Sequence, residues 1–107
     1  MGYTRHHCII IMGNEKVLTK VRKIAKEIFD PRMVSPVMHS PANCTHSLYI
    51  APDGSNDGWE MSNEYNEKRL FFYHELPQFY PEIYYVMEVE IDGCGEHTVT
   101  EIEKRRL

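Results

Sequence analysis

The stretch CIIIMGNEKVLTKVRKIAKEIF, residues 8–29, decides the fold of this 107-residue chain. Its first five residues are an unbroken apolar run closed by Gly13, which is typical of a strand buried in a sheet. Apolar residues then recur at helical spacing: Val17, Leu18, Val21, Ile24, Ala25, Ile28 and Phe29. We therefore predict a buried strand that leads directly into an amphipathic helix.

Both ends of this helix carry recognisable signals. Asn14 is a residue type that caps helix N-termini, and Glu15 places a negative charge in the first turn. Pro31 disfavours helical backbone in the residue before it, so we expect the helix to stop near Asp30.

The middle of the chain predicts shorter elements. Residues 33–38 form a candidate strand, and Pro36 within it favours an edge position. Residues 46–50 alternate apolar and polar side chains as a strand does. Residues 51–58 contain four strong turn formers and predict a long turn.

The second half predicts a helix over residues 63–76, ending before Pro77, with its inner side formed by Tyr65, Arg69 (by its stem), Phe72 and Leu76, and with Leu70 and Tyr73 beside them. Residues 78–84 are expected to be a connecting loop. Alternation over residues 85–91 predicts a strand, a turn at 92–95 follows, and residues 97–103 are expected to pair back.

The resulting order is β-α-β-β-α-β-β, in one domain spanning residues 1–107. Two helices on one face of a mostly antiparallel sheet is the natural architecture for this order, an α+β sandwich of the ferredoxin-like type. With 42% hydrophobic and 26% charged residues, the chain is neither disordered nor membrane-spanning.

Charge is unevenly distributed along the chain. Residues 1–29 carry six Lys or Arg against two Asp or Glu, whereas residues 30–107 carry six against fourteen. The first helix places Lys16, Lys20 and Lys23 outside its apolar stripe, either as a solvated face or as a docking surface for an acidic partner or phosphates. The acidic remainder of the chain disfavours nucleic-acid binding.

Three cysteines, Cys8, Cys44 and Cys94, form no close pair, and Cys8 lies in a predicted buried strand. We expect reduced thiols and a cytoplasmic protein. The first seven residues lack the apolar segment of a signal peptide, and the longest apolar run is far shorter than a membrane span.

Metal and cofactor sites are not predicted. Residues 53–64 approach the spacing of a calcium loop, but Glu60 and Met61 stand where the loop needs an apolar and a polar residue. The histidines and cysteines lack paired zinc-ligand spacing. We therefore expect no metal ligands and no cofactor.

Catalytic chemistry has little support in the sequence. The paired H-x-[ST] signature of two-histidine phosphoesterases fails, because Ser47 and Thr98 directly follow His46 and His97 and point to the opposite face of a strand. His6 and His7 begin a strand, where one points inward and the other outward. We assign no catalytic residues and favour a protein that is not an enzyme.

Trp59, the only tryptophan, follows Gly58 in the long turn. It either covers the core or, if exposed, anchors a partner. An aromatic-rich stretch over residues 71–85 exceeds what one helix stripe needs, so part of it is a candidate contact between copies of the chain.

Several segments resemble small proteins encoded by tailed bacteriophages: Tyr3-Thr4-Arg5-His6-His7 with the strand at 9–11, Val34-Ser35-Pro36, Ala51-Pro52-Asp53-Gly54-Ser55 and Gly58-Trp59. The resemblance spans residues 3–76. It implies an accessory protein of unassigned activity that acts inside an infected bacterium. Such proteins often neutralise a host defence or redirect a host enzyme, so the resemblance implies a host or phage protein as partner.

The leading hypothesis is a non-catalytic protein that binds such a partner through Lys16, Lys20, Lys23 and Trp59. A second hypothesis is a small-ligand binder, such as a sponge for a nucleotide signal, that uses Arg5, His6, His7, Asp53 and Ser55. A metal-dependent hydrolase that uses the histidines is the third.

Overall fold

The structure is a computed structural model that describes the backbone of residues 3–92 and 97–104 and the side chains of residues 6–56 and 58–91. Its elements are β1 (Tyr3–Gly13), α1 (Glu15–Ile28), η1 (Pro31–Met33), β2 (His46–Ile50), β3 (Asn56–Asp57), α2 (Glu60–Glu75), η2 (Leu76–Phe79), β4 (Ile83–Asp92) and β5 (His97–Lys104).

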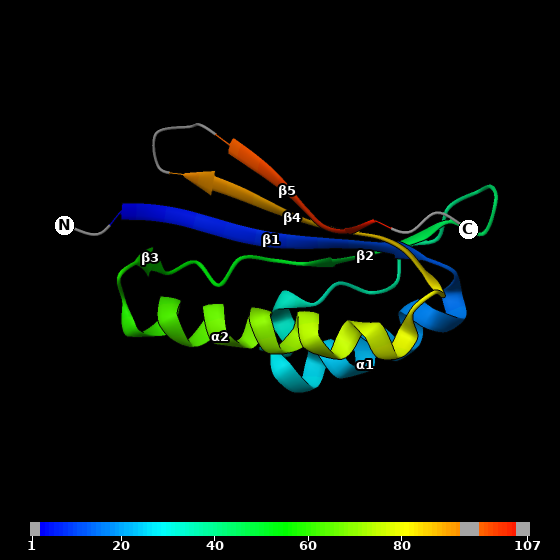
Figure 1. Ribbon diagram of the computed structural model, residues 1–107, viewed down its shortest axis with the longest axis horizontal. Helices are drawn as coiled ribbons and strands as arrows, with labels where there is room; N and C mark the ends of the chain where they lie inside the picture. The colour runs from blue at the N-terminus through cyan, green and yellow to red at the C-terminus, as the bar shows by residue number, and fades with distance from the viewer. Residues whose placement is uncertain (1–2, 93–96, 105–107) are drawn as a thin grey trace.

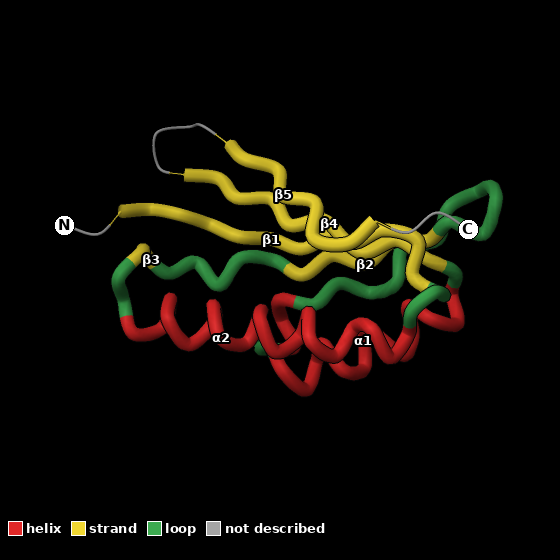
Figure 2. The backbone as a smooth tube through the Cα atoms, viewed as in Figure 1, coloured by secondary structure: helices red, strands yellow, loops and turns green. Residues whose placement is uncertain are grey.

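The molecule has two layers, an antiparallel sheet and a pair of helices that cover one of its faces (Figures 1 and 2). This arrangement confirms the predicted α+β sandwich. No helix in the described part of the chain has the length and apolar character needed to cross a bilayer.

The sheet has the strand order β2-β1-β4-β5, and β3 adds a short pairing to the start of β1. Outside β2 runs the segment 33–38, which we call the edge segment, and bridges Val34–Ile50 and Met38–Ser47 join it to β2. Both this segment and β1 are antiparallel to β2, so they run parallel to each other with β2 between them. β1, α1 and the segment therefore form a split βαβ unit. This is the arrangement that the ferredoxin-like type requires.

The core lies between the layers and follows the pattern of residues 8–29. Ile9 and Ile11 of β1 are fully buried, as are Val17, Leu18, Val21 and Ala25 of α1. Asn14 caps α1 as predicted, because its side-chain oxygen accepts from the backbone N–H of Val17 at 2.8 Å.

Several predicted boundaries were wrong. α2 begins at Glu60 rather than residue 63, directly after Trp59, and β4 begins at Ile83 within the expected loop. The expected turn at 51–58 contains β3. The candidate strand at 33–38 makes only two isolated bridges, since Pro36 interrupts the ladder. Most of the expected turn at 92–95 lies outside the described residues.

The inner side of α2 is only partly apolar. Phe72 is buried in the core and Tyr65 and Tyr73 pack against it, as predicted, but Leu70 is 69% exposed. Arg69 is buried whole rather than by its stem alone, with only 5% of the residue exposed. The helix therefore contributes core packing near its C-terminal end and polar contacts earlier in its length.

Candidate binding surface on the first helix

Lys16, Lys20 and Lys23 lie along the outward side of α1, opposite the stripe that packs in the core, and all three are exposed. We call these three residues the cationic face. Positions four and three apart neighbour each other on a helix surface, so the three ammonium groups share one stripe. Within the described residues, none of them lies within ion-pair distance of a carboxylate.

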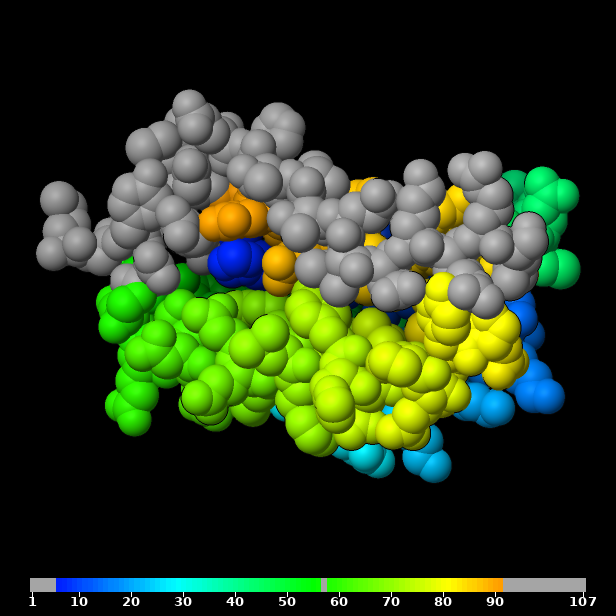
Figure 3. Space-filling model, in the orientation of Figure 1, coloured from blue at the N-terminus to red at the C-terminus, as the bar shows by residue number. Residues whose placement is uncertain are grey.

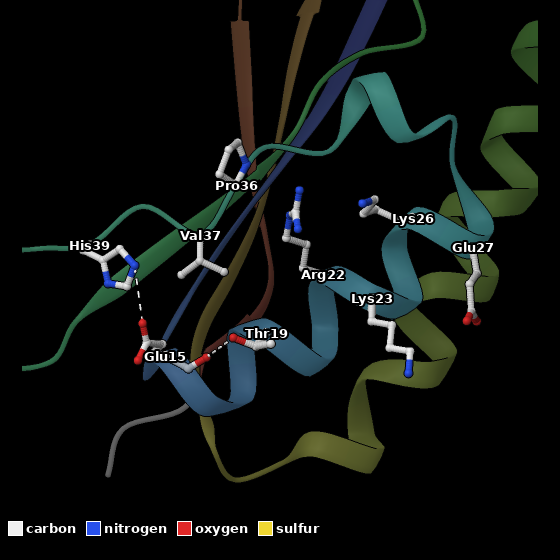
Figure 4. Close-up of a pocket in the computed structure, with 9 residues that line it drawn as sticks. All are labelled: Glu15, Thr19, Arg22, Lys23, Lys26, Glu27, Pro36, Val37 and His39. Atoms are coloured by element: carbon white, nitrogen blue, oxygen red, sulfur yellow. Dashed lines mark hydrogen bonds and ion pairs between the residues drawn. The ribbon is translucent and has the colours of Figure 1, made fainter.

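A groove of about 600 Å³ adjoins the cationic face, between α1 and the segment that follows η1 (Figure 4). We call it the α1 groove. Its helix side is formed by Glu15, Thr19, Arg22, Lys23, Lys26 and Glu27, and its other side by Pro36, Val37 and His39. Lys23 belongs to both the groove and the cationic face.

The groove wall is held in place by specific contacts. The Nε atom of Arg22 donates to the carbonyl of Ser35 at 3.0 Å, which ties α1 to the edge segment. At one end, His39 Nε2 lies 3.4 Å from a carboxylate oxygen of Glu15, and the dashed line in Figure 4 marks this contact. His39 also stacks edge-on against His46, with ring centroids 4.6 Å apart.

The charge of the groove is concentrated at its other end. In Figure 4, Arg22 and Lys26 extend into the space between α1 and the edge segment, whereas Lys23 and Glu27 extend away from that segment. Guanidinium and ammonium groups so placed favour a carboxylate or phosphate. Apolar contact surface is available at Val37 on the facing wall.

Trp59 is 52% exposed, but the structure does not bring it close to the start of α1. It precedes α2, whose 16 residues span about 24 Å. Figure 1 shows α2 beginning at one end of the long axis of the molecule and α1 beginning at the other. The lysines and the tryptophan are therefore separate features rather than one continuous surface.

Two residues of the small-ligand hypothesis, Asp53 and Ser55, contact each other. Asp53 accepts from both the backbone N–H and the hydroxyl of Ser55, at 2.7 and 2.6 Å. Its other carboxylate oxygen lies 3.6 Å from Arg69, in a pair whose side chains are 6% and 8% exposed. Arg69 also donates to the side chain of Asn66 at 2.6 Å. The hydrogen bonds and the ion pair of these groups are therefore made with one another.

His6 and His7 point to opposite faces of β1, as expected for adjacent strand residues. His7 lies on the helix side, where its Nδ1 is 3.7 Å from a carboxylate oxygen of Glu88 on β4. The same oxygen accepts from the hydroxyl of Tyr73 at 3.0 Å. In Figure 3 the early part of β1 and the end of β4 reach the surface above α2. The side chain of Arg5 lies outside those described.

Burial, followed by the negative charge of Glu88, raises the pKa of the Tyr73 phenol well above its ordinary value. Tyr73 therefore stays protonated and acts as a hydrogen-bond donor. Sequence patterns did not predict this polar cluster, although two signals of it were visible: Glu88 alternates with the apolar residues of its strand, and Arg69 lies on the inner side of α2.

The described residues contain no group of three or more His, Cys, Asp or Glu arranged to hold a metal ion. Cys8 is buried and Cys44 exposed, and both are free thiols. No protein-family model matches the chain, and neither a curated protein nor a solved structure matches it.

Proposed function

We propose that this chain is a non-catalytic binding protein whose cationic face and α1 groove dock an acidic surface of a partner protein. The observation that carries this proposal is the gathering of cations on one side of one helix, beside a groove, in a chain whose remaining residues are strongly acidic. Opposite charge on the partner would steer it to this side and speed its association.

A protein partner fits better than the alternatives. A nucleic acid would meet repulsion from the fourteen acidic residues between positions 30 and 107. Small-molecule sites are usually concave and mostly apolar, whereas the α1 groove is lined mainly by charged side chains. The short edge segment beside it offers apolar side chains that a protein surface can contact as well.

The resemblance to bacteriophage proteins suggests where the partner is found. We place it in the cytoplasm of an infected bacterium, as a host factor or another phage protein. Binding would modulate or block that factor, such as a component of an anti-phage defence.

A photo-crosslinking amino acid tests this directly. We would insert it at Thr19, which lies in the groove and is exposed, and as a matched control at Asn63, which is exposed on α2. We expect one partner to be captured in infected cells from Thr19 and not from Asn63. Capture from Asn63 alone, or the same products from both positions, would contradict the proposal.

A further inference from the structure

The face of the sheet that looks away from the helices is unusually apolar. Paired residues in a ladder lie on the same face of the sheet, so the strand register identifies the residues that point away from the helices. Its apolar members among the described side chains are Cys8, Ile10, Met12, Met38, Tyr49, Tyr85, Met87, Val89 and Ile91. We call these nine residues the outer face.

In β4, apolar residues occupy the side away from the helices and acidic residues lie on the side that faces them. The pairings Ile9–Glu88 and Ile11–Val86 place Glu88 on the helix side, and Glu90 shares that side. Met87, Val89 and Ile91 therefore point away from the helices. An antiparallel sheet with one solvated face normally turns its polar residues outward. In this part of β4 the apolar residues lie outside instead.

No helix in the described chain lies over the outer face, since α1 and α2 both cover the opposite side (Figures 1 and 2). Met38, Tyr49 and Ile91 are 56%, 42% and 44% exposed, five further members are half-buried, and Cys8 is buried beneath its neighbours. Strand spacing and residue rise give nine same-face residues a footprint of about 300 Å². A patch of this size reaches the range in which exposed apolar surface often has a function.

We infer that the outer face is the contact surface of a homodimer, in which two sheets pack face to face about a two-fold axis. The argument for a second copy is charge. In a two-fold contact a surface meets itself, so a charged surface would repel its own copy. Among the described side chains of β1, β2 and β4 that point outward, none is Asp, Glu, Lys or Arg, and the two polar ones are His6 and Ser47. β5 continues this face, and its register sets Glu101 beside Met87 and Lys104 beside Tyr85, so the charges at that edge are of both signs.

Packing two such faces about 10 Å apart buries the apolar side chains of both copies. The helices stay on the outside of the dimer, so each copy still presents its α1 groove. The footprint is small compared with about 800 Å² per partner in a stable interface, which favours a weak and reversible dimer.

Sedimentation equilibrium of the full chain between about 1 and 300 μM is the test, because a weak dimer becomes populated toward the upper end of this range. We expect a monomer–dimer equilibrium, together with a thermal midpoint that rises with protein concentration. The double variant Tyr49→Lys/Ile91→Lys changes two side chains that are already exposed, and it should weaken the dimer at least tenfold.

The matched control is Leu70→Lys/Phe71→Lys, which removes apolar residues that are 69% and 54% exposed on α2. We expect the control to dimerise as the wild type does. The inference is overturned if the wild type is monomeric throughout this range, or if the α2 variant dissociates the dimer and the sheet variant does not. The concentration dependence of the wild-type midpoint needs no variant, so misfolding of either variant leaves the test decisive.

Discussion

The pair formed by Arg69 and Asp53 is the most deeply buried charge interaction among the described residues, with side chains 6% and 8% exposed. It connects α2 to the loop before β3, and Ser55 and Asn66 supply further hydrogen bonds to the two partners. Burying two charges costs desolvation that their attraction only offsets when the remaining hydrogen-bonding capacity is also used. The pair therefore specifies where the loop lies more than it adds stability.

Replacing Arg69 with Met should strongly destabilise the protein, because it leaves the Asp53 carboxylate buried without its cation. We expect a loss of about 3 kcal/mol in the free energy of unfolding, measured by urea denaturation. Asp53→Asn in the Arg69→Met background should recover part of that loss. Equal stability of the single and double variants would contradict the assigned coupling.

Tyr73 gives a prediction with a defined pH range. The unfolded phenol has an ordinary pKa of 10.0, and burial together with Glu88 raises the pKa of the folded one. The folded state thus binds the proton more tightly. The contribution of the Tyr73 proton to the free energy of unfolding is therefore complete below pH 10 and is lost as pH rises further. The stability difference between wild type and Tyr73→Phe should shrink above pH 10 in urea denaturation. A difference that stays constant or grows up to pH 11 would contradict this assignment.

At the scale of elements, the connection between β1 and α1 is tightly constrained. A Cβ atom at Gly13 would lie 2.9 Å from Cγ1 of Val17 and 3.3 Å from the carbonyl oxygen of Glu82. Val17 is fully buried and, as a β-branched residue in a helix, has little rotamer freedom to move aside. Glycine is thus required by packing at the point where the strand turns into the helix.

Gly13→Ala should consequently destabilise the fold by about 1–3 kcal/mol, the usual cost of overpacking a core position. Chemical denaturation measures this loss of stability. Gly54→Ala serves as the comparison, because it introduces backbone strain without steric crowding. Gly54 has a φ of +83° but no atom within 4 Å of an added Cβ. Recovery of stability in Gly13→Ala/Val17→Ala would support the steric cause, whereas full wild-type stability of Gly13→Ala would contradict it.

Strong local periodicity made β1 and α1 predictable, since Ile9, Ile11 and the α1 stripe agree on one core face. The start of α2 was harder to predict, because Trp59 takes the N-cap position without a side-chain cap hydrogen bond. Exposed Met61, Leu70 and Phe71 also blur the helical stripe. In β4 the alternation predicts two faces, but only pairing with β1 determines which one meets the helices.

The candidate site was likewise predictable from the sequence only in part. The outward position of Lys16, Lys20 and Lys23 follows from the spacing of the buried α1 residues, so the sequence was enough to place them. The groove wall was not predictable, because Pro36, Val37 and His39 come alongside α1 through tertiary contacts such as Arg22 to Ser35. The separation of Trp59 from the lysines likewise depends on the direction of α2.

At the scale of the whole molecule, the two layers present surfaces of different character. The helix layer carries the cationic face and the α1 groove, and the sheet layer carries the uncharged outer face. A dimer formed through the sheets would display two copies of the cationic face on opposite sides. Such a dimer could engage two acidic partners, or one partner with two sites, at increased avidity.

The most direct test of the proposed function is the association rate of the crosslinked partner with charge-reversed variants at several salt concentrations. Lys20→Glu/Lys23→Glu removes cations from the proposed surface, and Arg32→Glu/Lys68→Glu makes the same charge change elsewhere. We predict that the first variant associates at least tenfold more slowly and loses most of its salt dependence, while the second stays near wild type. Equal rates for the two variants would contradict the assignment of α1 as the binding surface.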